Sequence, residues 1–75
     1  MNKVKVVSWN VNSIRARIDL LLDWTKKNNP DILLLQEIKA REEDFPFSAF
    51  DNLNYNIKIN GQKSYNGVAI FSKYP

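Results

Sequence analysis

The chain has 75 residues, with eleven Lys plus Arg, eight Asp plus Glu, and neither Cys nor His. This length allows one small domain with a marginal core. The composition excludes a disulfide, a Cys/His zinc site, a Cys nucleophile and a His general base within these residues. The net charge of +3 permits an anionic partner without requiring one, because salt screens a weak excess of charge.

No stretch of the sequence predicts membrane insertion. The longest apolar run, residues 32–35, is far below the roughly 20 residues that a membrane span needs. The N-terminus has no long apolar segment behind its first charges, so it does not resemble a signal peptide. We therefore expect no membrane partner and a cytoplasmic location, with which the lack of Cys agrees.

The first 36 residues predict a βαβ unit. Residues 3–9 combine β-branched and aromatic side chains with alternating lysines, which predicts a strand at a sheet edge. A helix is predicted over residues 17–27, where apolar side chains recur at helical spacing. Four consecutive apolar residues at 32–35 then predict a strand that is covered on both faces. Strand, helix and strand in this order make a right-handed crossover.

The second half of the chain predicts two further strands. A charged turn at 41–44 and one short helix within 45–50 come first. Tyr55, Ile57 and Ile59 alternate with polar residues, which predicts a strand with one wet face. Asn60-Gly61 signals a turn, and residues 68–72 predict a fourth strand. We expect the last two strands to pair antiparallel across a connection at 61–67.

These elements define an α/β fold that the 75 residues do not complete. The second strand requires cover on both faces, yet the sequence offers one clear helix. We therefore expect residues 1–75 to form the N-terminal portion of a single, larger α/β domain.

Three polar clusters follow predicted strands: Asn10 with Asn12, Gln36 with Glu37, and residues 63–66. Ligands of open α/β sheets gather at the carboxyl ends of strands, where parallel strands would place Asn10 beside Glu37. Carboxylate and amide oxygens without thiolate or imidazole suit a hard ion, Mg²⁺ or Mn²⁺. One Glu is a partial site for such an ion.

Each cluster also has a purely structural interpretation. Glu37 can be a surface or salt-bridged acid, and the two asparagines at 10 and 12 can be turn formers. Residues 63–66 can be a solvated hairpin loop, and Arg15 can lie on a solvent-exposed face at the start of a helix. Spacing alone leaves both interpretations open.

Three stretches together resemble the exodeoxyribonuclease III family of apurinic/apyrimidinic endonucleases. They are residues 8–17, residues 30–39 with Gln-Glu-x-Lys at their end, and residues 61–73. A strand that ends in Gln-Glu would by itself indicate only the wider endonuclease/exonuclease/phosphatase superfamily. Ser-Ile-Arg-Ala-Arg and Gly-Gln-Lys-Ser-Tyr-Asn-Gly-Val-Ala narrow the resemblance to the DNA-repair branch.

The resemblance implies a fold and a set of site residues. The fold is the N-terminal part of a four-layered α/β sandwich. Glu37 resembles the metal-binding glutamate, and Asn10 resembles the asparagine that orders the metal and phosphate site, which makes both catalytic residues. Asn12 occupies a position where some relatives have Asp close to the metal. The implied DNA contacts are Arg15, Lys39, Lys63, Tyr65 and Asn66.

The implied activity is Mg²⁺-dependent hydrolysis of the phosphodiester 5′ to an abasic site in double-stranded DNA, with 3′-to-5′ exonuclease activity. The family's catalytic His, Asp and Tyr have no counterpart in these 75 residues, so we expect the chain alone to be inactive and the full-length enzyme to be a monomer. Two alternatives remain: another phosphodiesterase or phosphatase of the superfamily, and a noncatalytic nucleic-acid-binding module.

Overall fold

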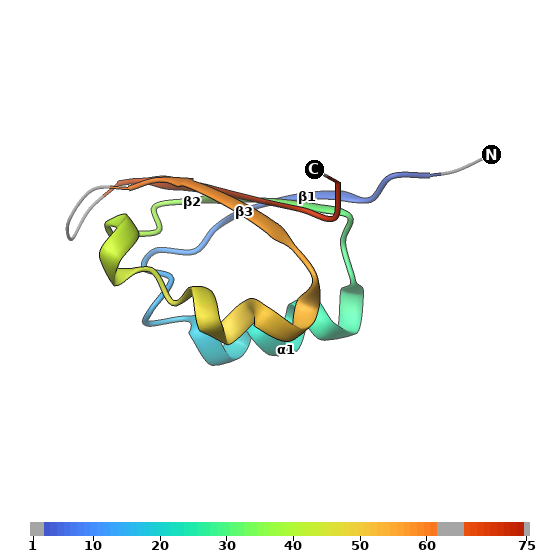
Figure 1. The fold of residues 1–75 in the computed structure, drawn as a ribbon, viewed down its shortest axis with the longest axis horizontal. Coiled ribbons are helices and arrows are strands. Elements are labelled where there is room, and N and C mark those ends of the chain that lie inside the picture. The colour runs from blue at the N-terminus through green and yellow to red at the C-terminus, as the bar shows by residue number, and fades with distance from the viewer. Residues whose placement is uncertain (1–2, 62–65, 75) are drawn as a thin grey trace.

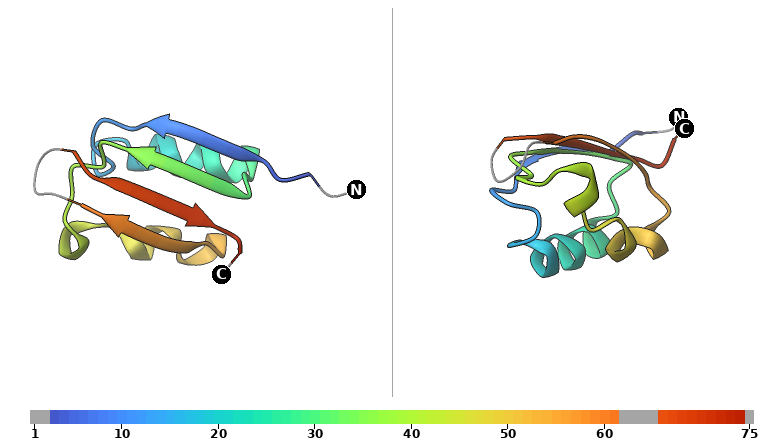
Figure 2. Two further views of the ribbon diagram at one scale, coloured as in Figure 1. Left: turned by 90° about the horizontal axis from the view of Figure 1, so that it is seen from above. Right: turned by 60° about the vertical axis from the view of Figure 1, so that its left-hand side comes forward.

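The structure, a computed structural model, describes residues 3–61 and 66–74. Within these ranges four strands form one mixed sheet in the order β1-β2-β4-β3. Figures 1 and 2 show the helical segments on one side of this sheet. The elements are β1 (Val6–Asn10), α1 (Ile18–Asn28), β2 (Ile32–Gln36), η1 (Glu42–Asp44), η2 (Phe47–Leu53), β3 (Asn56–Asn60) and β4 (Val68–Ser72), where η marks a 3-10 helix.

The pairing of the strands confirms the predicted α/β class. β1 and β2 run parallel on either side of the α1 connection, and β3 and β4 run antiparallel across residues 61–67. One pairing goes beyond the sequence analysis, because β4 also pairs antiparallel with β2 and so lies between β2 and β3. Strand β2 is therefore internal, and β1 is an edge strand of this sheet, as the alternating lysines at the start of the chain, now just before β1, predicted.

Two predicted boundaries move for identifiable reasons. β1 begins at Val6 and not at residue 3, because its partner β2 begins only at Ile32, directly opposite Val6. Helix α1 ends at Asn28, and Asn29 follows in the left-handed region with φ 49°. The Asn29 N–H donates to the carbonyl of Thr25 at 2.8 Å, and Pro30 cannot continue the helix.

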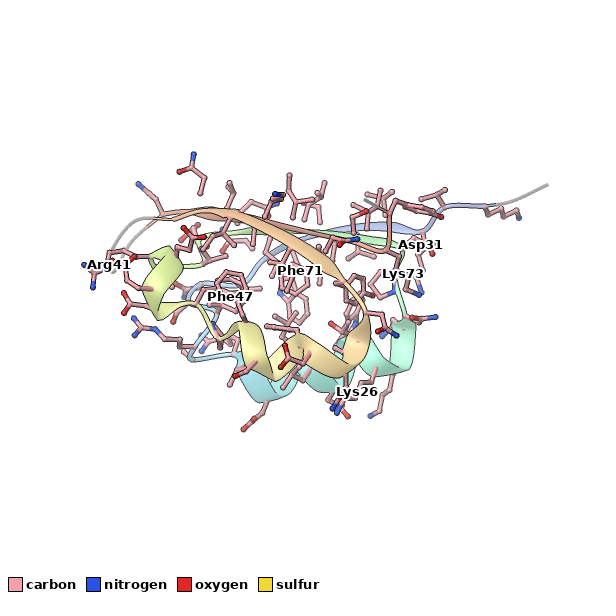
Figure 3. All side chains as sticks on the ribbon, in the orientation of Figure 1. Lys26, Asp31, Arg41, Phe47, Phe71 and Lys73 are labelled. Atoms are coloured by element: carbon pink, nitrogen blue, oxygen red, sulfur yellow. The ribbon has the colours of Figure 1, made fainter. Side chains whose placement is uncertain are left out.

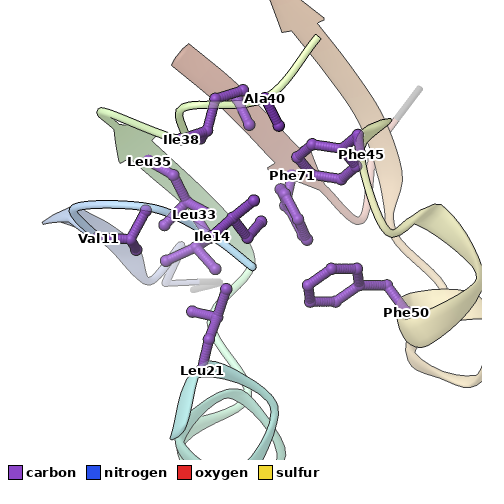
Figure 4. Close-up of a cluster of buried hydrophobic side chains, with 11 residues drawn as sticks. Val11, Ile14, Leu21, Leu33, Leu35, Ile38, Ala40, Phe45, Phe50 and Phe71 are labelled. Carbon is purple, nitrogen blue, oxygen red and sulfur yellow. The ribbon is translucent and has the colours of Figure 1, made fainter. Parts of the chain in front are cut away.

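The hydrophobic core lies between the sheet and the helical segments (Figure 4). Strand alternation sends Leu33 and Leu35 of β2 to this side, together with Phe71 of β4, and all three are fully buried. Phe50 of η2 packs edge-on against Phe71 with ring centroids 4.7 Å apart. Leu21 of α1 is also fully buried and packs into this core from the helical side.

The opposite face of the sheet is open within the described residues, so the cover on both faces that the sequence of residues 32–35 predicts is present on one face only. Ile32 and Leu34 are only half-buried, because the described helical segments all pack on the other face. Beside them, Val6, Val68 and Ile70 expose 54%, 47% and 47% of their surface. The described chain therefore presents an apolar sheet surface to solvent.

The segment between β2 and β3 contains two short 3-10 helices in place of the single short helix expected within 45–50. The charged turn at 41–44 forms η1, in which the Nε of Arg41 donates to the carboxylate of Asp44 at 3.0 Å. The second, η2, extends to Leu53 and supplies Phe50 to the core. No helix in the described ranges is long and apolar enough to cross a membrane.

Candidate functional site

The structure brings Asn10 and Glu37 together at the carboxyl ends of β1 and β2. Asn10 is the last residue of β1 and lies opposite Gln36, the last residue of β2. Glu37 follows directly, and the Nδ2 of Asn10 donates a hydrogen bond to its carboxylate. This contact joins residues 27 positions apart in the sequence.

Glu37 is oriented by the alternation of the segment that follows β2. Ile38 and Ala40 are fully buried in the core, while Glu37 and Lys39, which alternate with them along the chain, are half-buried. Apolar side chains at alternate positions thus anchor the segment and direct the acid and the lysine away from the core. Glu37 and Lys39 both adopt left-handed backbone angles, with φ 53° and 55°, which few residues other than glycine and asparagine adopt.

Backbone hydrogen bonds hold these unusual conformations in place. The carbonyl of Glu37 accepts the N–H of Ser13 at 2.8 Å on one side. On the other side the N–H of Lys39 donates to the carbonyl of Asn66 at 2.9 Å. The segment therefore lies between the loop after β1 and the residues before β4, as a continuation of the sheet beyond its regular ladder.

The loop after β1 adds a third polar side chain to the site. Asn12 has φ 46°, and its N–H donates to the Oδ1 of Asn10 at 3.1 Å. Its own Oδ1 accepts the ammonium of Lys39 at 2.5 Å. A continuous polar chain therefore runs from Lys39 through Asn12 and Asn10 to Glu37, and we call these four residues the strand-end cluster.

Asn12 is the member of this cluster to which the sequence assigned no definite role. The only sequence signal for its position is the Asn-x-Asn spacing directly after a strand, which favours a turn closed by the first asparagine. The structure shows that turn, and shows in addition that the second asparagine holds Lys39.

The salt-bridged interpretation of Glu37 finds no support in the described residues. Their ion pairs join Lys27 with Asp23, and Arg41 with Glu43 and Asp44. Glu37 accepts its hydrogen bond from a neutral amide. The half-buried carboxylate is therefore held by an amide and not by a cation of those pairs.

The structure describes three of the five predicted DNA-contacting residues, which are Arg15, Lys39 and Asn66. Arg15 is exposed and lies near Asp44, whose pKa is lowered first by the hydrogen bond from Arg41 and further by the charges of both arginines. Asn66 is exposed beside the strand-end cluster, tied to Lys39 by its backbone. Lys63 and Tyr65 lie outside the described residues.

The donor set of the strand-end cluster fits one part of a magnesium site. Mg²⁺ takes one or two carboxylates and keeps several waters, and Glu37 supplies one carboxylate with an amide beside it. Between residues 3 and 61 and from 66 to 74, no group of three or more Asp, Glu, His or Cys side chains gathers around a common point. Glu37 can therefore act as one ligand of a hard cation whose remaining ligands lie elsewhere.

The fold and the strand-end cluster together define a class of protein. Residues 7–75 match the Endonuclease/Exonuclease/phosphatase family, so the chain belongs to this family. The sequence is also 41% identical over 70 residues to exodeoxyribonuclease III of Haemophilus influenzae, a match that covers 93% of this chain. The resemblance to the exodeoxyribonuclease III branch is thereby confirmed.

Solved structures agree with this assignment. An AP endonuclease from Archaeoglobus fulgidus superposes with a TM-score of 0.90 at 42% identity over 95% of the chain. A 3′ phosphatase, NExo, from Neisseria, bound to product DNA hairpin, superposes with a TM-score of 0.89 at 41% identity, again over 95% of the chain. The chain spans only 26% of the Haemophilus protein and 28% of each of these two structures.

Proposed function

We propose that the protein carrying this chain is a Mg²⁺-dependent DNA-repair nuclease. It cleaves the phosphodiester 5′ to abasic sites in double-stranded DNA and degrades 3′ ends in the 3′-to-5′ direction. The observation that carries the proposal is the hydrogen bond between the Asn10 amide and the Glu37 carboxylate at the strand ends. The similarity to an exodeoxyribonuclease III and to an AP endonuclease supports the choice of substrate.

The four residues of the strand-end cluster have separate roles in this proposal. Glu37 binds Mg²⁺, or Mn²⁺ in its place, and Asn10 keeps the carboxylate oriented. A magnesium ion bound by these residues would supply Lewis-acid stabilisation of the negative charge on a phosphate oxygen. Lys39, fixed by Asn12, adds a positive charge to the same edge of the sheet, where negative charge grows during the reaction.

DNA contacts in this proposal come from the surface around the strand-end cluster. Asn66 and Arg15 are both exposed, and Lys63 and Tyr65 belong to the same connection in the sequence as Asn66. Such contacts attract the phosphate backbone without reading the base sequence, and they weaken as salt rises.

The chain forms, in this proposal, the N-terminal portion of one larger domain. Relatives are about four times as long, since the chain spans 24% to 28% of them. The apolar face that includes Val6, Val68 and Ile70 is the surface against which the remaining part packs to complete a four-layered sandwich. The groups that prepare the water then come from that remaining part, and the complete enzyme is a cytoplasmic monomer.

A phosphatase activity is the second candidate, because one close structural neighbour is described as a 3′ phosphatase. The same carboxylate would serve a phosphate monoester. Full-length protein should be assayed on an abasic-site duplex, on a duplex with a 3′-phosphate, and on inositol phosphates. Cleavage of the abasic-site duplex at the highest rate supports the nuclease. DNA binding with no turnover of any substrate would favour the noncatalytic module.

The decisive substitution is Glu37→Gln in the full-length protein. It keeps the shape of the side chain and its bond from Asn10, yet removes the charge that holds the cation. We expect the rate of abasic-site cleavage to fall by about a hundredfold or more and the Mg²⁺ requirement to rise. Thermal stability should change little, because Glu37 has no ion pair among the described residues.

The matched control is Glu42→Gln, which removes an exposed acid from the nearby charged turn. It should leave both the rate and the magnesium titration unchanged. A Glu37→Gln protein with a normal magnesium titration would remove Glu37 from the metal site and with it the proposed function.

A further inference from the structure

A polar pair of side chains, Ser8 and Gln36, lies on the open face of the sheet directly behind the strand-end cluster. The Nε2 of Gln36 donates a hydrogen bond to the Oγ of Ser8 at 3.0 Å and another to the carbonyl of Leu34 at 3.2 Å. Strand alternation places Ser8 and Asn10 together on the open face of β1, while Trp9 between them packs against the core. The Gln36 amide therefore points back along the open face, away from the strand ends.

Gln36 has a nearer polar neighbour than Ser8. Asn10 lies directly opposite Gln36 in the parallel ladder, with the two backbones about 5 Å apart, whereas Ser8 lies opposite Leu34. The bond from Gln36 to Ser8 thus crosses the ladder diagonally, and this path is longer than the straight path to Asn10. A side chain with that reach can also reach the side-chain amide of Asn10.

Asn10 uses both ends of its amide within the strand-end cluster. Its Nδ2 donates to the Glu37 carboxylate, and its Oδ1 accepts the N–H of Asn12 at 3.1 Å. If the Gln36 amide turned toward Asn10, its NH₂ group would compete for both of these acceptors. Hydrogen bonds to an ionised acceptor are about twice as strong as those between neutral groups, so the Glu37 carboxylate favours such a turn. Gln36 therefore needs a partner that keeps its amide away from Asn10.

We propose that Ser8 is a positioning residue, which holds the Gln36 amide on the open face and so leaves Asn10 to orient Glu37. The inference rests on the proposed function, because Glu37 is the acid that binds the metal there. A hydroxyl suits this role, since it accepts the Gln36 bond on a side chain too short to extend along the strand itself. In the larger domain this face is covered, so water does not replace the hydroxyl as a partner for Gln36.

NMR of the side-chain NH₂ groups in the full-length protein tests this role without any catalysis. In Ser8→Ala we expect the signals of both Gln36 and Asn10 to shift, because Gln36 loses its acceptor and takes a partner from Asn10. In the double variant Ser8→Ala with Gln36→Met, the Asn10 signals should return to their wild-type positions, because Met has a similar length and no amide. Unchanged Asn10 signals in Ser8→Ala would overturn the proposal.

Turnover of an abasic-site duplex should follow the same pattern. Ser8→Ala should lower kcat by about threefold to tenfold and leave the KM for DNA within about twofold, because the DNA-contacting residues are untouched. Adding Gln36→Met should restore most of this loss, whereas two substitutions that merely weaken the sheet would add their losses. A double variant as slow as Ser8→Ala would contradict the positioning role.

Two further variants control for the hydroxyl and for the stability of the sheet. Ser8→Thr keeps the hydroxyl on a residue that suits strands, so it should retain kcat. Ser72→Ala removes another hydroxyl from the open face, since Ser72 alternates with Phe71 on the helical side and lies beside Lys73, at the end of the molecule away from Arg41 (Figure 3). It should change neither kcat nor the Asn10 signals. An equal loss of kcat in Ser72→Ala would mean that activity follows sheet stability alone, against the proposal.

The two arms separate this inference from the proposed function. A wild-type protein that cleaves no abasic-site duplex would refute the proposed nuclease, and the Asn10 signals would still decide whether Ser8 restrains Gln36. An active wild type whose Ser8→Ala variant keeps both its kcat and its Asn10 signals would refute the role of Ser8 alone.

Discussion

Asn12 connects the two charged residues of the strand-end cluster, and it does so as a neutral amide. Its Oδ1 accepts the ammonium of Lys39 at 2.5 Å, and its N–H bonds to the Asn10 side chain that holds Glu37. The cluster therefore contains one carboxylate and one ammonium group that are joined through neutral side chains. A change of charge at position 12 should affect both Lys39 and Glu37.

If the proposed function holds, Asn12→Asp should lower the concentration of Mg²⁺ needed for half-maximal activity of the full-length protein by severalfold. A second carboxylate in the strand-end cluster adds attraction for a hard cation, although Lys39, which contacts this side chain, offsets part of it. A magnesium titration of cleavage rate measures the effect. Asn12→Ala is the comparison, because it frees Lys39 without adding charge and should raise the magnesium requirement. A higher requirement in Asn12→Asp would mean that the lysine takes up the new charge entirely.

Tyr55 predicts a dependence of stability on alkaline pH. Its pKa is raised above the ordinary value by burial and, to a smaller extent, by the charge of Asp31. Folding thus favours the neutral hydroxyl, which donates to the Pro30 carbonyl. This contribution is fully present below the unfolded pKa of about 10 and is lost as pH rises through the folded pKa.

Urea unfolding of the wild type and of Tyr55→Phe between pH 8 and about 11 measures this contribution. At pH 8 the Phe variant should be less stable, because the Pro30 carbonyl loses its donor. The difference in the free energy of unfolding should shrink above about pH 10, since ionised Tyr55 no longer donates. Comparing the two proteins cancels the titration of the lysines. A constant difference would show that the hydroxyl does not titrate with folding.

At the scale of elements, the segment after β2 and the end of β3 approach each other very closely. A Cβ on Gly61 would overlap the carbonyl oxygen of Ala40 and lie 3.4 Å from the Cα of Arg41. Gly61 follows β3 directly, so its lack of a side chain lets that strand end pass against the segment that carries Glu37 and Lys39. Glycine at position 61 therefore has two roles: it favours the turn after Asn60, and it allows two backbones to pack closely.

Gly61→Ala should therefore destabilise the protein by about 1–3 kcal/mol and displace the segment from Ile38 to Arg41. The free energy of unfolding from urea titration gives the first effect, and NMR shifts of Lys39 give the second. Asn60→Ala, a change at the exposed neighbouring position, should stay within about 0.5 kcal/mol of the wild type. Equal effects of the two substitutions would contradict the packing argument.

The elements were largely predictable from the sequence, because periodicity reports which side chains are buried. Alternation at 56–60 gave a strand with one wet face, and β4 has the predicted bounds of residues 68–72. The insertion of β4 between β2 and β3 was not predictable, since alternation does not specify a strand's partner. The contact of Lys39 with Asn12 depends on left-handed backbone angles at both residues. Asparagine permits this conformation at position 12, but nothing in the sequence indicates it at Lys39.

At the scale of the whole molecule, the open sheet face provides a test of the proposed larger domain. Ile70 lies in the middle of this face, between Leu34 of β2 and Lys58 of β3. If a further layer covers it in the full-length protein, Ile70→Lys should lower the free energy of unfolding by about 3 kcal/mol or more, because it buries an unpaired charge.

Leu20→Lys is the matched control for this test. Leu20 is 57% exposed on α1, on the side of the molecule away from the open face. Its substitution should cost no more than about 0.5 kcal/mol. An equally mild effect of Ile70→Lys would mean that solvent still reaches the face in the complete protein, and that the remaining part of the chain folds separately.

The backbone bonds that flank Glu37 have a consequence for how the proposed activity would be lost on unfolding. The same amides that continue the sheet past its last regular pair also fix the acid, so no hinge or separate flap carries it. Denaturant should then abolish catalysis and melt the sheet at one concentration, without an earlier stage in which the fold persists and turnover has stopped.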